Sequence, residues 1–547
     1  MPATFDPKMT KVAPPPVVPK PPRRSLFSSK MAPPAPPAPK PVKAQDPVGP
    51  PEPELSQEEK KLRKRARRRK GGIAALVLVL VVAALALSAN SLPGILFPHR
   101  DKYTILTVDY NAAGSDMIYL TSSGPRFTGS DSELRGAEYI ASQFAAAGLK
   151  NVEIIEYNIT LWEMTSASLS LVSYMRGGNV PNPLEVPREF QHKTDFALQG
   201  YSGSYTHTRW LDDLQVLDVG NGTDVAAYAN ANGRAVIVTN DGSVTSTGLF
   251  IRAWEQGAAA NIVHNVAMDA DIGYPAIAFS ANGVDSKGHA IPLPDNYSGN
   301  GPDIPSIMVS KKTGDAIKEG ASMGSRVRMD IQVSIGPRPC RVVVGDKLGC
   351  EQPNKIIMVG AHHDTVYISP GAVDNTAGTV NVIAIAREIG KLKPLKTIRF
   401  ATFGGEEEGV LGSYEYFKAN SEKLKGHLEA MLNLDMTNVY TKRSHTLPIV
   451  VNYKPWLKTL GEIKAEAYEK IPQLSGYDVA IYQGVLNSSS DMATFALEGY
   501  RVGSCWGSGC LEYHTPKDTV QYVTTESFLA VGGVYGSFAL ALAGGTK

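Results

Sequence analysis

The chain has 547 residues, of which 43% are hydrophobic and 20% charged, so it is long enough for two or three folded domains. Its net charge of +2 is divided unevenly, because residues 1–100 carry 18 Lys and Arg against 6 Asp and Glu while the remainder is net acidic. Since the positive charge lies outside the part expected to fold, the composition gives no reason to expect a nucleic-acid partner.

Residues 1–70 are expected to form a disordered cytoplasmic tail. The first 53 residues contain 18 prolines and no apolar period, a composition that cannot form a packed core. This segment suits a spacer or, alternatively, a ligand for SH3-type domains. Nine Lys and Arg then follow within residues 60–70.

A transmembrane helix is predicted over residues 71–97. The run from Ile73 to Ala89 is almost wholly apolar, and its 17 residues at ~1.5 Å each would span ~25 Å, about the thickness of the bilayer core. The adjacent basic run argues against a buried core helix and places the N-terminus in the cytoplasm. We therefore expect a single-pass protein of the cell membrane, extracytoplasmic from about residue 100 onward.

All four cysteines lie in the expected extracytoplasmic part. An even number of cysteines in an exported domain favours disulfide bonds. Thiolate metal ligands are a weaker alternative, because neither short spacing resembles CxxC. Four cysteines allow three pairings, and the short intervening loops favour Cys340–Cys350 and Cys505–Cys510.

The first half of this part begins with a helix and a strand and then breaks into short elements. A helix is predicted over 131–148, with Ser130 or Asp131 as its N-cap and Gly148 as its stop, followed by a strand over 151–161. From about 165 to 335 the pattern predicts Gly, Asn and Asp turns, one helix that ends near residue 260, and strands at 234–239, 261–263 and 304–309. No row of acidic or His residues converges there, so we interpret this region as an accessory module.

The second half alternates strands and helices. Strands are predicted at 355–361, 397–403 and 430–434, and helices at about 378–390, from 412, and at 455–469. Alternating elements with continuously apolar strands predict an α/β fold, in which a mixed, largely parallel sheet is flanked by helices.

Acidic and His side chains follow three of the predicted strands and also lie near the C-terminus. They are His362, His363 and Asp364, then Asp374, then Glu406, Glu407 and Glu408, then Asp435, and finally His514. Ligands of open α/β sheets bind beyond the carboxyl ends of the strands, so these side chains are expected to meet at one edge. Imidazoles and carboxylates are the usual ligands of zinc, and gathered carboxylates repel one another unless a cation is present. The pattern therefore predicts a metal site.

These motifs resemble the M28 family of metallopeptidases with two metal ions. The resemblance covers residues 101–165 and 336–547 as two parts of one catalytic domain, and residues 166–335 resemble an inserted protease-associated (PA) domain. The membrane anchor and the insert resemble the glutamate carboxypeptidase and transferrin-receptor branch. The segment NLDMTN, however, is more similar to secreted bacterial aminopeptidases.

The resemblance implies a role for each residue of the site. His362 and Asp435 would bind one Zn²⁺, Glu407 and His514 the second, and Asp374 both, with a cis peptide bond between Asp374 and Asn375. Glu406 would be the general base, Asp364 would orient His362, and Tyr513 would either stabilise the reaction intermediate or serve only in packing. His363 and Glu408 would not be ligands.

Two departures from the family pattern affect the expected substrate pocket. The loop CWGSGC carries Trp506 where secreted aminopeptidases have a tyrosine, and we expect this loop to shape the pocket. Met492 stands where the family often has a histidine. Asp491 before it would either support the site or cap a helix.

The favoured function is a zinc-dependent exopeptidase acting on peptides, most simply an aminopeptidase. A carboxypeptidase or dipeptidase for acidic peptides is the alternative, but it would need converging arginines, and residues 400–547 contain only Arg443 and Arg501. An inactive receptor-like protein and a glutaminyl cyclase are further alternatives. The sequence leaves open the substrate, the role of the insert and whether the protein forms a homodimer.

Overall fold

The computed structural model describes residues 102–174, 186–265, 282–284, 290–292, 304–440, 444–488, 490–507 and 509–545. All of them belong to one compact unit that begins at His99. The predicted tail (1–70) and transmembrane helix (71–97) lie outside the described residues. Among the helices that the structure does describe, none combines the length and the apolar character needed to cross a bilayer.

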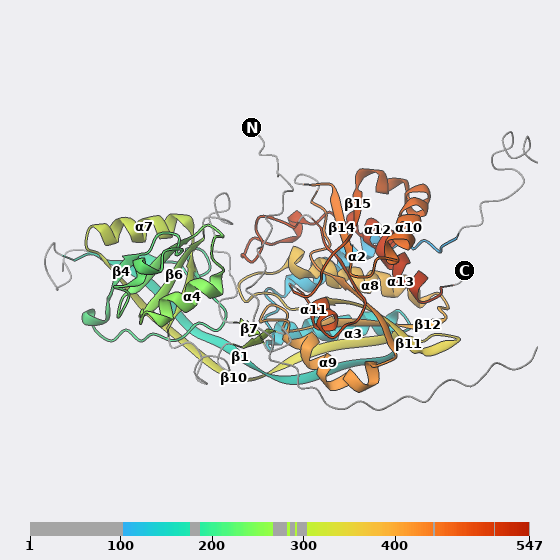
Figure 1. Ribbon diagram of the computed structural model, residues 1–547, viewed down its shortest axis with the longest axis horizontal. Helices are drawn as coiled ribbons and strands as arrows, with labels where there is room; N and C mark the ends of the chain where they lie inside the picture. Colours follow the sequence, from blue (N-terminus) through green and yellow to red (C-terminus); the bar gives the residue numbers. More distant parts are fainter. Residues whose placement is uncertain are drawn as a thin grey trace, which may run out of the picture. The chain divides into compact units, whose positions relative to one another are not determined.

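The part expected to be catalytic is built on a sheet in the strand order β15-β14-β16-β13-β11-β12-β10 (Figure 1). Its strands are β10 (Arg326–Lys347), β11 (Gln352–His362), β12 (Lys396–Phe403), β13 (Leu428–Leu434), β14 (Thr446–Val451), β15 (Asp478–Gln483) and β16 (Val502–Cys505). The central pairs β12/β11, β11/β13 and β13/β16 are parallel, whereas β10/β12 and β14/β16 are antiparallel. The predicted mixed, largely parallel sheet is confirmed.

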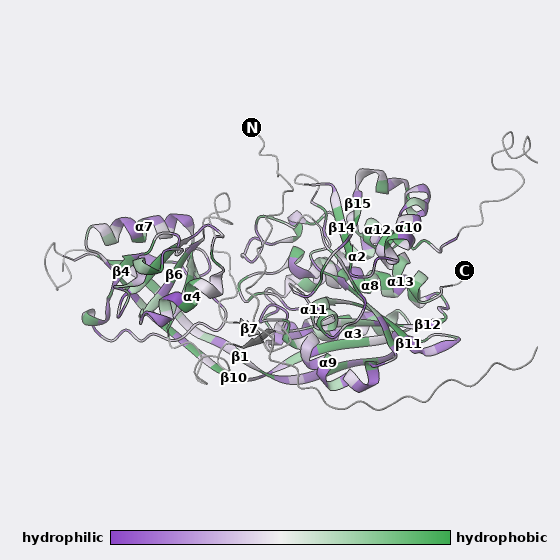
Figure 2. Ribbon diagram, viewed as in Figure 1, coloured by the Kyte–Doolittle hydropathy of each residue, from purple (hydrophilic) through white to green (hydrophobic). Residues whose placement is uncertain are grey.

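Helices cover both faces of this sheet. Alternate residues of each strand point to opposite faces, and because both sets are apolar in the central strands, both faces are buried. Ile357 and Val359 of β11 pack in the larger core with helices α2, α3, α8 and α10, whereas Met358 packs in a second core with α9 and α11. The helices are α2 (Tyr110–Ser122), α3 (Asp131–Ala146), α8 (Ala377–Gly390), α9 (Leu411–Leu424), α10 (Trp456–Lys470), α11 (Met492–Leu497), α12 (Ser527–Ala530) and α13 (Ser537–Leu542). Hydrophobic residues lie along the central strands, and hydrophilic residues lie on outer helices such as α7 (Lys311–Ser322) and α9 (Figure 2).

The predicted helix 131–148 is α3, which ends at Ala146. The Ser130 side chain accepts a hydrogen bond from the Glu133 N–H, as an N-cap does. Gly148 has φ +78°, a left-handed conformation that favours glycine and stops the helix as expected.

A long antiparallel ribbon leads from this sheet into the region predicted to be an insert (Figure 1). β1 (Lys150–Val172) pairs with β10 from Lys150–Asp346 to Val172–Arg326, so β1 is far longer than the strand predicted over 151–161. The region beyond the ribbon has its own core and contains β2 (Arg188–Phe190), β3 (Phe196–Leu198), β4 (Leu214–Asp218), β5 (Ala235–Asn240), α4 (Ser246–Glu255), β6 (Ala260–Asn265), β9 (Ser306–Val309) and α7 (Lys311–Ser322), with the short pair β7 (Asn282–Val284) and β8 (Ala290–Pro292). The expectation of a single helix is wrong, because α7 is a second one.

The predicted disulfide bonds are absent, and all four cysteines are free thiols. Cys340 lies inside β10, whose seven following residues extend for about 23 Å before the chain turns toward Cys350, far beyond the ~7 Å limit for bonded Cα atoms. Cys505 packs in the larger core, whereas the Cys510 thiol lies 3.7 Å from Asp518 Oδ1.

Candidate metal centre

The candidate ligands stand at the carboxyl ends of the central strands. His362 ends β11, Glu407 follows β12, and Asp435 directly follows β13. Asp374 lies in the turn Ala372–Thr376 that leads into α8, and His514 lies in the loop after β16. The parallel strands therefore deliver side chains that are far apart in sequence to one edge of the sheet.

Asp374 lies between the two histidines. Its Oδ1 is 3.2 Å from His362 Nε2 and its Oδ2 is 3.1 Å from His514 Nε2. Asp435 Oδ1 is 3.5 Å from His362 Nε2, and Glu407 Oε2 is 3.0 Å from His514 Nε2. Asp374 thus lies between His362 with Asp435 on one side and His514 with Glu407 on the other, and the peptide bond after Asp374 is cis, as expected.

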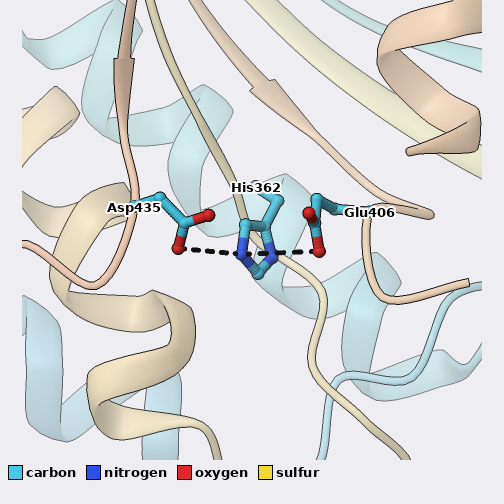
Figure 3. Close-up of side chains that lie close together, drawn as sticks. All are labelled: His362, Glu406 and Asp435. Carbon is cyan, nitrogen blue, oxygen red and sulfur yellow. Dashed lines mark ion pairs between the residues drawn. The ribbon is translucent and has the colours of Figure 1, made fainter. Parts of the chain in front are cut away.

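The Glu406 carboxylate lies beside the group of five candidate ligands. Figure 3 shows Glu406 and Asp435 on opposite sides of the His362 imidazole. Glu406 Oε2 is 3.9 Å from His362 Nε2, and 11% of the side chain is exposed against 1% for Glu407. The Glu406 carboxylate is therefore the more accessible of the two.

Asp364 holds the far side of the His362 ring. Its Oδ1 is 3.4 Å from His362 Nδ1, while its Oδ2 accepts hydrogen bonds from the Thr128 hydroxyl and the Glu407 N–H. Contacts of this kind fix the orientation of a metal-binding imidazole and leave Nε2 to face the centre.

His363 points away from the centre. Its Nε2 lies 3.1 Å from Glu133 Oε1, and its Nδ1 lies 3.1 Å from the Thr402 hydroxyl. The expectation that His363 is not a ligand agrees with this geometry.

The two imidazoles are surrounded by carboxylates. Burial alone would lower the pKa of His362 and of His514, but facing carboxylates, Glu406 and Glu407 foremost, outweigh burial and raise both pKa values well above the usual range. Burial raises the pKa of Glu407 to about 7 and that of Glu406 well above its usual value. At Asp374 the two imidazoles outweigh burial and hold the pKa below its usual value.

This donor set fits a divalent metal ion. Asp435 Oδ1 is a buried atom with no hydrogen-bond donor among the described residues, and it faces His362 Nε2. The sets His362, Asp374, Glu407 and His362, Glu406, Asp435 each place three ligand atoms within 4.8 Å of one another. Two imidazoles and several carboxylates at this spacing are the ligands that zinc prefers, and a cation offsets the repulsion among them.

The backbone at two of these positions adopts the left-handed conformation that non-glycine residues rarely take. His514 has φ +58°, and Met436, directly after Asp435, has φ +47°. Such conformations cost about 1–3 kcal/mol each and persist where surrounding contacts hold them, commonly at functional sites.

Two buried polar side chains for which no role was predicted connect the loops that carry the candidate ligands. The Asn375 amide NH₂ donates a hydrogen bond to the Leu434 carbonyl, and the amide Oδ1 accepts one from the Met436 N–H. The Asn375 side chain therefore holds the backbone on both sides of Asp435. The Arg126 guanidinium, 1% exposed, donates to the carbonyls of His363, Leu120 and Pro370 and to the Thr376 hydroxyl. No local sequence signal marks these residues, since their partners lie up to 250 positions away.

A pocket of about 340 Å³ opens beside Asp435. Its walls include Met436, Leu486, Met492 and Trp506, so the CWGSGC loop does help to shape it. Asp491 is buried next to the pocket wall at the start of α11, but its side chain makes no capping hydrogen bond, so the helix-cap interpretation is wrong.

Tyr513 stacks on His514, with ring centroids 3.7 Å apart and an interplanar angle of 19°. Burial and the carboxylates of Asp374 and Glu407 raise the pKa of its phenol well above the usual value. A tyrosine hydroxyl is protonated at neutral pH and can donate a hydrogen bond.

Known proteins match this chain over its catalytic part and, in some cases, over most of its length. Residues 343–539 match Peptidase family M28. Aminopeptidase YwaD of Bacillus subtilis is 27% identical over 423 residues, which are 75% of this chain and 79% of that protein. An aminopeptidase of Pseudomonas aeruginosa is 28% identical over 262 residues, 47% of this chain and 45% of that protein. The solved structure of BSAP, a zinc aminopeptidase from Bacillus subtilis, superposes with a TM-score of 0.61 at 23% identity and covers 81% of this chain and 97% of that chain.

Proposed function

We propose that this protein, whose residues 343–539 match peptidase family M28, is a zinc-dependent aminopeptidase that removes N-terminal residues from peptides. The observation that carries the proposal is the position of Asp374, whose two carboxylate oxygens face the imidazoles of His362 and His514 at 3.2 and 3.1 Å.

We propose two zinc ions per chain, one held by His362 and Asp435, the other by Glu407 and His514, with Asp374 shared. Zinc bound there would lower the pKa of the attacking water and polarise the scissile carbonyl. Asp364 keeps His362 oriented for this task through the contact at Nδ1.

Glu406 is the residue proposed to move the proton. It accepts a proton from the attacking water and then donates it to the leaving amine, a role that suits a partly exposed carboxylate with a raised pKa. The protonated phenol of Tyr513, stacked on His514, is the proposed hydrogen-bond donor to the oxygen that becomes negative during the reaction.

The pocket beside Asp435 supports a preference for N-terminal residues with uncharged, largely apolar side chains. Met436, Leu486, Met492 and Trp506 contribute apolar walls, and Asp435, a proposed zinc ligand, is the only charged residue among those lining it. A Lys or Arg side chain would find no separate carboxylate there to replace its hydration.

The carboxypeptidase alternative has little support from the described residues. Recognition of a terminal carboxylate would need a cation directed into the site. Arg501, however, stacks on the Tyr453 ring at 4.1 Å and is exposed, and Arg443 lies outside the described residues.

We also propose that the catalytic part lies outside the cytoplasm, anchored by residues 71–97, and that residues 166–335 are a PA-like module that restricts access to the site. The basic run before the apolar run supports the orientation. In the insert, His192 Nε2 lies 3.0 Å from the Tyr367 hydroxyl, on the loop that follows the ligand His362. Protease treatment of intact cells tests the orientation, since an extracytoplasmic domain is degraded while the N-terminal tail is protected.

A substrate panel tests the proposed activity on the full-length chain. Leucyl-, lysyl- and glutamyl-anilides, N-blocked acidic dipeptides and an N-terminal glutaminyl peptide are assayed with and without chelator. The proposal expects chelator-sensitive cleavage of the leucyl compound above the others. Cleavage of only the blocked dipeptides would identify a carboxypeptidase, cyclisation alone a glutaminyl cyclase, and no turnover of any compound a binding protein.

A further inference from the structure

Asp518 lies in the same loop as His514, four residues later, and is fully buried. Its Oδ1 accepts a hydrogen bond from the Val373 N–H at 2.8 Å, and its Oδ2 accepts one from the Asp374 N–H at 3.0 Å. Its backbone carbonyl accepts a third, from the Ala372 N–H at 3.2 Å. Asp518 therefore binds three consecutive backbone N–H groups of the loop that presents Asp374.

A carboxylate is required for this pattern. Each of its oxygens accepts one backbone N–H, whereas an amide side chain would have only one acceptor and would set its own NH₂ against the other N–H. The described residues give Asp518 no ion pair with a basic side chain, and a buried carboxylate without one is costly. These backbone N–H groups, together with the Cys510 thiol 3.7 Å from Oδ1, hold the carboxylate in place.

The contact joins two candidate ligands on different loops. Asp374 Oδ2 faces His514 Nε2 at 3.1 Å, and His514 keeps a left-handed backbone conformation that is not intrinsically favourable. A displacement of either loop would change the distance between these two side chains. Asp518, on the His514 loop, accepts a hydrogen bond from the backbone N–H of Asp374 itself.

We propose that Asp518 is a positioning residue for the metal centre: it ties the backbone of the Asp374 loop to the loop that carries His514, so that both ligands are in place before the ion binds. The proposal rests on the proposed zinc site. Asp518 does not touch substrate or the reacting atoms, so its effect is exerted through Asp374 and His514.

The test compares Asp518→Asn with the wild type in the metal-free full-length chain, with zinc affinity measured by competition against a chromophoric chelator. We expect zinc binding to weaken by about 10- to 100-fold, the usual effect of removing a group that orients a metal ligand. The matched control is Asp346→Asn, which alters another buried carboxylate of the catalytic part, one that pairs with Arg399 instead. This control should lower the melting temperature but leave zinc affinity unchanged. Asp518→Glu, which keeps two acceptor oxygens, should bind zinc more tightly than Asp518→Asn.

Three results would overturn the proposal. They are wild-type zinc affinity in Asp518→Asn, an equal loss of affinity in Asp346→Asn, and an Asp518→Asn chain whose metal-free form has lost native circular dichroism, which would make the residue a general requirement for folding. Zinc binding is measured without substrate. A wild-type chain that binds zinc but cleaves no aminoacyl-anilide would therefore refute the proposed activity and leave this test in place.

Discussion

The adjacent carboxylates Glu406 and Glu407 allow the proton-transfer role to be separated from the ligand role by two matched substitutions. Glu407 Oε2 is 3.0 Å from His514 Nε2, whereas Glu406 Oε2 is 3.9 Å from His362 Nε2 and is the more exposed. Replacement of either Glu by Gln keeps the size of the side chain but removes its negative charge and its ability to accept a proton. We expect Glu406→Gln to lose catalysis and Glu407→Gln to lose zinc.

The expected size of the first effect follows from the role. General acid–base catalysis contributes about 10²- to 10⁴-fold, or about 3–5 kcal/mol of transition-state stabilisation. Glu406→Gln should therefore lower kcat by that factor at nearly unchanged KM, with zinc content equal to that of the wild type. The measurements are steady-state hydrolysis of a leucyl-anilide and zinc content by mass spectrometry after dialysis.

The reasoning would be refuted by the opposite assignment of the two residues. Because Glu406, His362 and Asp435 also lie within 4.8 Å of one another, a Glu406→Gln chain that loses one zinc, together with a Glu407→Gln chain that keeps its full complement, would make Glu406 the ligand. Retained activity in Glu406→Gln would remove it from the mechanism altogether.

Three further predictions concern stability. Zinc removal should lower the melting temperature as well as abolish activity, because the clustered carboxylates lose their counter-ion, and added zinc should restore both; an unchanged melting temperature in calorimetry would contradict the proposed site. Burial lowers the pKa of His192 to about 4, below its value in the unfolded chain, so the unfolded state binds more protons and stability falls as the pH drops from about 6.5 to 4. That loss should be about 1–2 kcal/mol after allowance for solvent screening, and urea unfolding of His192→Gln should show it reduced. Arg126→Met should destabilise the fold by about 3 kcal/mol or more in the same assay, because it leaves buried carbonyls without donors, and a change below 1 kcal/mol would show that water replaces the guanidinium.

The sequence predicted the site best where an acidic or His residue directly follows a strongly apolar strand. The segment ending at Ala361 is apolar enough to be assigned as a buried strand, so the position of His362 at its end could be predicted before the structure was known. The same logic placed the triplet Glu406, Glu407 and Glu408 and Asp435 at this edge, whereas the choice of Glu407 as the ligand came from the family resemblance. His514 follows no such strand, and its assignment depended on family resemblance alone.

The residues that the sequence did not reveal act through partners far along the chain. Arg126 is a single charged residue in a loop with no candidate ligand near it in the sequence. Asp518 follows His514 by four residues, but its backbone partners Val373 and Asp374 lie 145 and 144 positions away. The cysteines were misinterpreted for a related reason, since their closeness in sequence was taken as closeness in space, although β10 extends Cys340 away from Cys350.

The pairing of β1 with β10 affects how insertions and deletions between these two strands would act on the rest of the fold. The chain leaves the catalytic part along β1 and returns along β10, and the two strands are hydrogen-bonded neighbours throughout, while β10 also pairs with β12 just before the ligand-bearing loop. Both ends of the region beyond the ribbon are thus held by the pairing of β1 with β10. Changes of length in the region beyond the ribbon should therefore leave β10 paired with β12 in the same register, and with it the strand that precedes Glu406 and Glu407.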